Sequence, residues 1–411
     1  MKKTLTVLLL ILSCSILTLT AQTWTKMADF PGLPRNLASS FVIGHYAFVG
    51  CGINLSGSTN YSDFYKWNQH TNTWSAITAY PGAGQNADIC FTIEGKGYVG
   101  LGFNGNGKTD FWRFDTISNS WTSMAAYPGA GRYAASYFVI GHKAYVLGGS
   151  QGGAPYLQDV WMYDAHTNAW TAKSNYPGGK IEGMFAFTIG NRAYVGGGFD
   201  GTNYISSFWE YDTTNDTWTS AASFPFILGG EATGFVLGRK AYVADGWTTL
   251  AFHMPLGYIY DTATKAWSSF TNLGTNGIER YYAMSFRVGN YGYICTGTDS
   301  TGGASLNDLW QYSDNNFLST NDIQVSANQQ INLYPNPANS NVNLVYSSLS
   351  NGKNIVTLTD ITGRIINTIN LQGTQGCLTI PVSNLANGMY FYSVLDEQQH
   401  PIKAGKLIVT H

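Results

Sequence analysis

The chain has 411 residues, which is enough for two or three ordinary domains, and its hydrophobic fraction of 44% excludes a wholly disordered protein. Charged residues make up only 11% and the formal net charge is −2, so the basic excess that nucleic-acid-binding proteins use is absent and we expect no nucleic acid as a partner. The 47 glycines and the aromatic fraction of 15% favour many short strands joined by tight turns, and we predict an all-β protein.

The N-terminal residues predict a secretory signal peptide. Lys2 and Lys3 precede an apolar stretch from Leu5 to about Leu19, and cleavage after Ala21 would remove residues 1–21. The stretch is too short and too rich in Ser and Thr for a transmembrane helix, and no later segment qualifies, so we expect no transmembrane segment in the mature chain. Lipidation at Cys14 is an alternative that the sequence leaves open.

Four cysteines remain in the mature chain, and their spacing indicates neither a zinc site nor a disulfide framework. They are Cys51, Cys90, Cys295 and Cys377, and none belongs to a Cys-x-x-Cys pair. We interpret them as small buried residues within strands. No dense Asp-rich calcium loop is present either, and we predict no metal and no cofactor.

An internal repeat follows, and tryptophans spaced 47 to 50 residues apart mark it: Trp24, Trp74, Trp121, Trp170, Trp218 and Trp267. Each unit predicts a hairpin of two apolar strands around a Gly-containing turn, as in Phe138 to Gly149. A third strand with an aromatic pair comes next, as in Trp161 to Asp164, and the following marker Trp begins a fourth. The third strand of the sixth unit has no Trp after it, whereas Trp24 has no hairpin before it. The N-terminal strand is therefore predicted to complete the last sheet.

The repeat resembles the kelch motif. The resemblance rests on the paired glycines of Gly148-Gly149 and Gly196-Gly197, on the marker Trp, and on the aromatic residue seven positions before it, such as Tyr163 before Trp170. It covers about 290 residues and implies a six-bladed β-propeller over residues 22–314, with its sheets arranged around a central channel.

The amino-acid composition changes after the sixth repeat. Residues 315–330 are rich in Asn, Ser, Thr and Gln and predict a linker, and residues 331–411 alternate short strands with turns as in a small Ig-like β-sandwich. The segments Leu333 to Pro337 and Asn387 to Phe391 resemble the C-terminal sorting domain of type IX secretion substrates. That resemblance implies contact with the type IX secretion machinery and a secreted or outer-membrane cell-surface location. Whether the tail is removed on export stays open, and we expect a monomer.

We predict a ligand site where the innermost strands begin. The residues thirteen positions before the second-strand aromatic are Arg35, Gln85, Arg132, Ile181, Gly229 and Arg280. Arginines near this position ring the central pocket of peptide-binding kelch propellers and grip acidic side chains, so the resemblance implies a similar role here. With neighbouring polar and aromatic residues and Trp247 in the fifth repeat, the predicted ligand-binding set is Arg35, Gln85, Arg132, Tyr133, Glu182, Glu231, Trp247, Arg280 and Tyr281. The alternative is that these residues cap strands and bind channel water.

The sequence favours a binding protein for a glycan or an extracellular protein over an enzyme. One alternative is a carbohydrate-active enzyme like the six-bladed sialate mutarotase, with Glu182 or Glu231 as acid or base and Arg132 or Arg280 for a substrate carboxylate. A copper centre like that of galactose oxidase is not predicted, because most histidines of the repeats fall in turns remote from the point where the inner strands begin. A structural surface protein is the remaining alternative.

Overall fold

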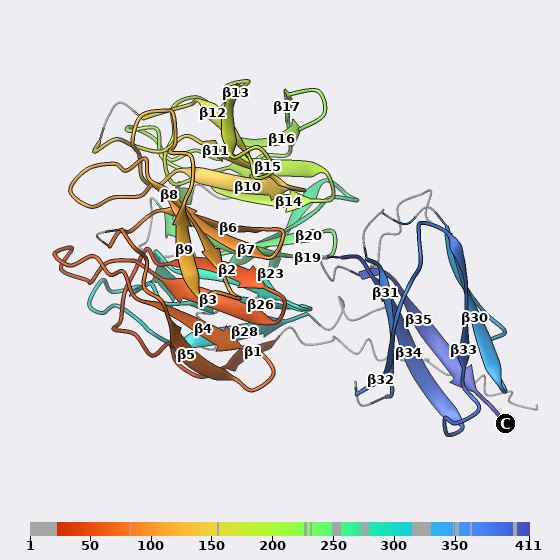
Figure 1. Ribbon diagram of the computed structural model, residues 1–411. Coiled ribbons are helices and arrows are strands. Elements are labelled where there is room, and N and C mark those ends of the chain that lie inside the picture. The colour runs from red at the N-terminus through yellow and green to blue at the C-terminus, as the bar shows by residue number, and fades with distance from the viewer. Residues whose placement is uncertain are drawn as a thin grey trace, which may run out of the picture.

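A computed structural model describes residues 23–314 and 330–411, except 83, 154–155, 226–227, 231, 249–255, 271–272, 274–278, 348, 350–352, 362–363 and 398–400. Strands dominate both parts (Figure 1). Among the described residues no helix has the length and apolar character needed to cross a membrane. The predicted signal peptide and all of the predicted linker except Gln330 lie outside the described residues.

Residues 23–314 form six four-stranded antiparallel sheets, here called blades 1 to 6. Blade 1 has strands β2 (Ser39–Ile43), β3 (Tyr46–Gly50), β4 (Phe64–Asn68) and β5 (Thr73–Ile77). Blade 2 has β6 (Ile89–Ile93), β7 (Lys96–Gly100), β8 (Phe111–Asp115) and β9 (Ser120–Ser123). Blade 3 has β10 (Ser136–Ile140), β11 (Lys143–Leu147), β12 (Val160–Asp164) and β13 (Ala169–Lys173). Blade 4 has strands β14 (Phe185–Ile189), β15 (Arg192–Gly196), β16 (Phe208–Asp212) and β17 (Thr217–Ser220). Blade 5 has β19 (Thr233–Leu237), β20 (Lys240–Ala244), β22 (Gly257–Asp261) and β23 (Ala266–Phe270). Blade 6 has β25 (Met284–Val288), β26 (Tyr291–Cys295), β28 (Leu309–Ser313) and β1 (Thr23–Lys26).

The six blades close into a ring. The innermost strands contact one another in the order β2, β6, β10, β14, β19 and β25, and β25 returns to contact β2. The last sheet is completed by β1, which pairs with β28 so that Trp24 lies opposite Tyr312. The all-β six-bladed propeller and its closure by the N-terminal strand are thus confirmed. Closure leaves only short outer edges, which protects the sheets from edge-to-edge association.

Aromatic side chains pack the blades internally and against each other. In the first hairpin of blade 3, the rings of Phe138 and Tyr145 stack at 4.8 Å, and the equivalent pairs stack in all the other blades. The marker tryptophans join consecutive blades, since Trp170 Nε1–H donates to the Ala125 carbonyl and four others make the equivalent bond: Trp74, Trp121, Trp218 and Trp267. The regular spacing of Trp in the sequence therefore reflects a packing role between blades.

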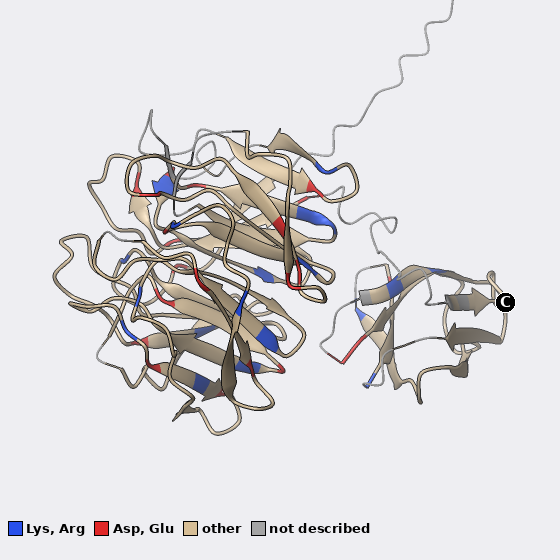
Figure 2. Ribbon diagram, turned by 90° about the horizontal axis from the view of Figure 1, so that it is seen from above, with Lys and Arg blue, Asp and Glu red and all other residues tan. Residues whose placement is uncertain are grey.

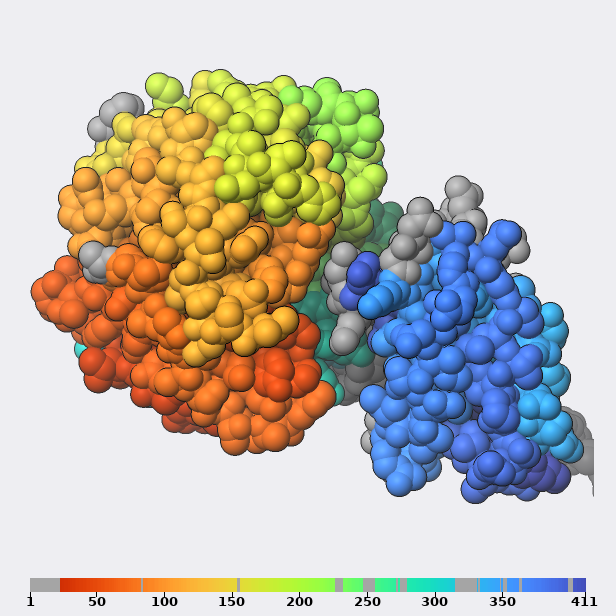
Figure 3. All heavy atoms as spheres, viewed as in Figure 1, coloured from red at the N-terminus to blue at the C-terminus, as the bar shows by residue number. Residues whose placement is uncertain are grey.

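The strand order sorts the connections onto two faces. Each inner strand begins on the face that also holds the second-to-third-strand loops, here called the loop face, and the hairpin turns lie on the opposite turn face. On the loop face each blade carries a short antiparallel bridge: Asn36↔Ile53, Asn86↔Phe103, Tyr133↔Ser150, Glu182↔Phe199, β18 (Leu228–Gly230) with β21 (Trp247–Thr248), and β24 (Arg280–Tyr281) with β27 (Thr298–Asp299). Charged residues are sparse over the propeller (Figure 2), and the blades pack into a continuous surface on the side seen in Figure 3.

The C-terminal part is a β-sandwich, as predicted. One sheet has the order β29 (Gln330–Tyr334), β30 (Asn341–Ser347), β33 (Gly376–Pro381), and the other β32 (Ile365–Asn370), β31 (Ile355–Thr359), β34 (Gly388–Leu395), β35 (Pro401–Val409). Both sheets contribute buried aliphatic residues to one core, among them Val342, Leu344, Val356 and Leu407. Strand β29 begins at Gln330, the last residue of the predicted linker, because its backbone already pairs with Ser347 there.

Candidate functional site

The three arginines predicted to bind a ligand are buried beneath the loop face. The Arg132 side chain is fully buried, and its two terminal nitrogens pair with both carboxylate oxygens of Asp159 at 2.8 Å each. Its remaining bonds go to the carbonyls of Ala130 and Gly148 at 3.1 and 2.9 Å. The same pattern holds for Arg35 with Asp63 and for Arg280 with Asp308.

Such arginines stabilise the junction between the inner strand and the third strand. A fully buried guanidinium that already holds a carboxylate and a carbonyl cannot present its planar fork to an external anion. Burial would raise the pKa of Asp159, but hydrogen bonds from Arg132 outweigh it and the pKa lies below its usual value. We therefore assign Arg35, Arg132 and Arg280 a structural role, and a direct part in ligand binding stays a prediction that their burial disfavours.

Blades 2 and 4 show what happens without the arginine. In blade 4 the corresponding residues are Ile181 and Ser207, so the cation and the anion are lost together. In blade 2 Gln85 replaces Arg, and its Nε2–H donates to Asp88 at 3.1 Å instead. Gln85 is only 2% exposed, and its contribution is to hold Asp88.

Asp88 is the unusual residue of the central channel. The inner strands enclose a cavity of about 350 Å³. Its layer nearest the loop face is formed by Ala38, Asp88, Ala135, Met184, Ala232 and Ala283. Asp88 accepts hydrogen bonds from Ser39 Oγ and Gln85 Nε2, yet burial dominates and raises the pKa of this carboxyl to about 7. Four of the six blades have Ala here, so the repeat does not require a carboxyl at this position.

Polar and aromatic groups continue from Asp88 into the channel. Cys90, Tyr137, Ser40 and Ser285 line the same cavity. Burial raises the pKa of the Tyr137 hydroxyl and of the Cys90 thiol far above their usual values, so both stay protonated near neutral pH. The lining of this cavity therefore combines neutral hydroxyl and thiol groups with one titrating carboxyl.

A collar of backbone hydrogen bonds frames the loop-face end of the channel. The N–H of Leu37 donates to Tyr282 O, that of Ala87 to Leu37 O, that of Ala134 to Ala87 O and that of Gly183 to Ala134 O, at 2.9 to 3.3 Å. All five residues have φ between 50° and 66°, a left-handed backbone conformation that is costly for residues other than Gly. The collar links consecutive blades and makes the channel mouth a rigid rim.

Partly exposed aromatic rings lie around this rim on blades 2 to 4. We call Phe103, Tyr133, Tyr156, Phe199 and Tyr204 the aromatic arc. The ring centroids of Phe103 and Tyr133 lie 5.0 Å apart in an edge-to-face arrangement. The Phe199 ring centroid lies 6.0 Å from that of Tyr156 and 4.9 Å from that of Tyr204. All five rings have intermediate exposure, so their faces remain available to a ligand.

Glu182 is the acidic group within the arc. Its backbone pairs with Phe199, and its Oε2 atom is buried without a hydrogen-bond partner among the described residues. Burial raises the pKa of the Glu182 carboxyl, and the hydroxyls of Tyr156 and Ser150 offset this only in part. A buried carboxylate oxygen without a donor is costly. The Glu182 residue as a whole is partly exposed, so a side-chain rotation that brings this oxygen to a ligand hydroxyl would relieve that cost.

The other residues predicted to bind a ligand do not all lie at the channel mouth among the described residues. Tyr281 is 9% exposed and packs against Tyr282 at 4.9 Å. Glu231 lies outside the described residues. The backbone of Trp247 pairs with Gly230, which places it at the repeat position held elsewhere by Ile53, Phe103, Ser150, Phe199 and Thr298. Its role in ligand binding stays a prediction.

The sequence interpretation missed Asp88 and most of the aromatic arc. The signal was available for two arc residues, because Phe103 and Phe199 each follow the second-strand aromatic by five residues, as Trp247 does. Asp88 was recognisable as the one acidic residue at a position that four blades fill with Ala. In both cases comparison of the repeats with one another carries the information, which residue type alone does not.

Comparisons with known proteins agree with this architecture. The family described as Kelch motif matches residues 131–175 and 183–225, and the family described as Secretion system C-terminal sorting domain matches residues 332–410. Among 479 matching chains of solved structures is one described as "Structure of YjhT", with a TM-score of 0.59 and 17% sequence identity over 69% of this chain and 95% of that chain. At this identity the similarity shows the fold alone. A search of curated proteins found no match.

Proposed function

We propose that this chain, an exported kelch propeller with a secretion system C-terminal sorting domain, binds a glycan at the loop-face mouth of its central channel. The observation that carries the proposal is the Glu182 carboxyl, which lies beside Tyr156 of the aromatic arc and has a buried oxygen with no donor among the described residues. Sugar hydroxyls are such donors, and the apolar face of a sugar ring fits an aromatic face.

The physical match concerns both polarity and shape. Bonds from a hydroxyl to a carboxylate are among the stronger hydrogen bonds in proteins, and they gain strength where water is excluded. The aromatic arc supplies contact area on blades 2 to 4. Asn86 lies buried beside it, because it pairs with Phe103 and its amide bonds Asn60. A mouth lined by aromatic rings and one carboxyl favours a flat, hydroxyl-rich ligand.

A glycan array probed with the exported chain tests the proposal. Glu182→Gln keeps the shape of the side chain but removes its charge, and we expect signals to fall at least tenfold. Glu210→Gln, on β16 of the same blade, is the matched control and should leave the signals unchanged. Equal signals from wild type and Glu182→Gln would refute the mouth as the binding site. A blank array would favour a protein partner or a structural role.

Catalysis on the bound sugar is the second candidate, and Asp88 is the observation that favours it. A carboxyl with a pKa of about 7 inside a cavity is suited to both accept and donate a proton at neutral pH. For any sugar found on the array, exchange between its anomers measured by NMR should be accelerated by wild type and not by Asp88→Asn. Binding without acceleration would leave the chain a binding protein.

A further inference from the structure

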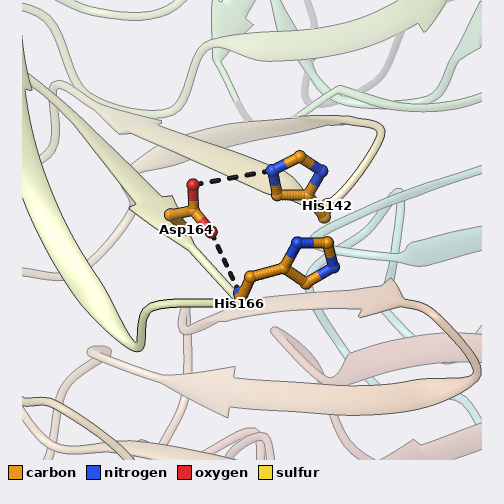
Figure 4. Close-up of side chains that lie close together, drawn as sticks. All are labelled: His142, Asp164 and His166. Atoms are coloured by element: carbon orange, nitrogen blue, oxygen red, sulfur yellow. Dashed lines mark hydrogen bonds and ion pairs between the residues drawn. The ribbon is translucent and has the colours of Figure 1, made fainter.

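Two histidines and two carboxylates meet on the turn face, away from the channel mouth. His142 lies in the turn between β10 and β11, and Asp164 and His166 lie at the turn between β12 and β13 (Figure 4). Glu94 reaches them from the first hairpin turn of blade 2, and its Oε1 atom lies 2.6 Å from His166 Nε2. Three turns of two blades thus contribute to one cluster.

The distances are close to those of a metal site. One ligand atom from each of His142, Asp164 and His166 lies within 4.8 Å of the others, and His142 Nε2 is 3.5 Å from Asp164 Oδ2. Zinc bonds of about 2.0–2.1 Å in a tetrahedron place ligand atoms roughly 3.3 Å apart. The two imidazoles stack at 4.1 Å with parallel planes, so a ring rotation is needed for both nitrogens to converge. His166 and Glu94 are exposed, which leaves them free to make these small shifts.

Asp164 is held in position for a ligand. Its Oδ1 atom accepts the backbone N–H of His166 at 2.9 Å, which forms an Asx turn and leaves Oδ2 on the side of His142. A carboxylate oriented by a backbone donor loses little conformational freedom when it binds a cation. The same Asx turn recurs in blades 2, 4 and 5, where Asp115, Asp212 and Asp261 accept the equivalent backbone N–H, so the repeat itself orients this carboxylate.

Glu94 occupies a position that the hairpin turn does not favour. The first turn residue has positive φ in every blade, and the other five blades use glycine: Gly44, Gly141, Gly190, Gly238 and Gly289. Glu94 adopts φ 49°, a left-handed conformation that is uncommon for any residue with a side chain and favours Asn or Asp among them. The blade 2 turn also differs at its second residue, because Gly95 has positive φ and the second turn residues of the other blades do not. Glu94, with its contact to His166, therefore departs from the repeat.

Blade 1 provides an internal comparison. His45 and His70 occupy the same turn positions and stack at 4.5 Å with parallel rings. There Asn68 replaces the aspartate and still accepts the His70 N–H at 2.9 Å. Gly289 of the preceding blade replaces the glutamate. Blade 1 therefore has the histidine pair and the turn but neither carboxylate.

We propose that His142, His166, Asp164 and Glu94 form a binding site for one divalent transition-metal ion of the Zn²⁺ type. Imidazole and carboxylate ligands together suit such ions, and two carboxylates neutralise the charge of a divalent cation. The site lies on the turn face and does not depend on the function proposed for the loop face. It also departs from our prediction from sequence, which expected no metal.

The test is a calorimetric titration of the exported chain with Zn²⁺ after treatment with a chelator. Wild type should bind one Zn²⁺, and Asp164→Asn should weaken binding at least tenfold, because the amide is a poorer ligand than the carboxylate. Blade 1 shows that Asn supports this turn, so the variant should keep the wild-type melting temperature. The double variant His45→Ala/His70→Ala is the matched control and should bind as wild type does.

Each of several results would overturn the site. They are the absence of Zn²⁺ binding at millimolar concentration, equal affinity of wild type and Asp164→Asn, and loss of binding in the blade 1 double variant. X-ray absorption of the Zn²⁺ complex gives a second readout. It should show nitrogen and oxygen ligands only, and a sulfur shell would place the ion at a cysteine instead.

Discussion

The junction between the inner and third strands is built differently in two groups of blades. Blades 1, 3 and 6 place a buried arginine against an aspartate that lies 27 or 28 residues further along the chain, as in Arg132 and Asp159. Blade 4 has an apolar and a small residue in these places, Ile181 and Ser207, and its sheet has the same strand order. Blade 2 keeps the aspartate as Asp110 but has Gln85 in place of the arginine, and Asp110 accepts hydrogen bonds from Tyr80 and Trp112. The fold therefore accepts the complete ion pair, the carboxylate with neutral donors, or neither residue.

This difference separates residues that repeat from residues that depart from the repeat. A side chain that recurs at one position in several blades, such as the buried arginine, serves a packing or hydrogen-bonding contact within its blade. Asp88 and Glu94 each stand where most other blades have Ala or Gly. Both are acidic, and both come with a physical cost, burial of a carboxyl for Asp88 and positive φ for Glu94. The departures are therefore the better candidates for function.

Breaking one ion pair should have the largest effect. Arg132→Ile leaves Asp159 without its partner, and we expect the free energy of unfolding to fall by about 3 kcal/mol, the lower end for a broken buried pair because Asp159 is partly exposed. The double variant Arg132→Ile/Asp159→Ser copies blade 4 and should recover most of this loss. Urea denaturation of the three proteins measures both effects. A double variant no more stable than Arg132→Ile would show that the junction of blade 3 requires the pair.

The same pairs predict how stability depends on pH. The pKa values of Asp159 and Asp308 are lowered in the folded protein, since bonds from the arginines outweigh burial. Their contribution is present above the usual carboxyl pKa and is lost as the pH falls through the lowered values. The blade 3 double variant should therefore lose less stability than wild type on acidification. An identical acid transition in both proteins would contradict this assignment.

The fold was predictable from sequence to a greater extent than the site. Strand hairpins, the marker Trp and the missing partner of Trp24 are local or periodic features, and each blade repeats them, so the six blades and their closure followed. The role of Arg132 was not predictable from sequence. Its partner Asp159 is distant in sequence, and residue type alone does not distinguish a buried guanidinium from one that faces a ligand. Glu182 was identified as a candidate, but its burial among aromatic rings depends on the geometry of three blades.

Removing the charge of Asp88 should change how stability depends on pH. Because burial raises the pKa of Asp88 from 3.8 to about 7, the folded state favours the neutral carboxyl, and wild type loses stability as the pH rises from about 4 to 7. A difference of about three pKa units corresponds to at most about 4 kcal/mol. Asp88→Asn stays neutral, so its melting temperature relative to wild type should rise over this range and then stay constant. A difference independent of pH would show that the channel carboxyl keeps an ordinary pKa.

Replacing Glu94 should have the smallest effect, and its sign is the informative part. Glu94→Asn creates an Asn-Gly turn with Gly95, the preferred sequence for a hairpin turn in which both central residues have positive φ, as they do here. We expect the variant to be more stable than wild type by about 0.5–1 kcal/mol in the presence of a chelator, because the exposed contact with His166 contributes little in return. With excess Zn²⁺ the order should reverse, since a bound ion stabilises only the protein that holds it more tightly. Melting curves of both proteins with chelator and with Zn²⁺ measure this. A variant less stable than wild type under chelator would mean that Glu94 is kept for the turn itself, and the comparison with the five glycines would then carry no argument for a metal.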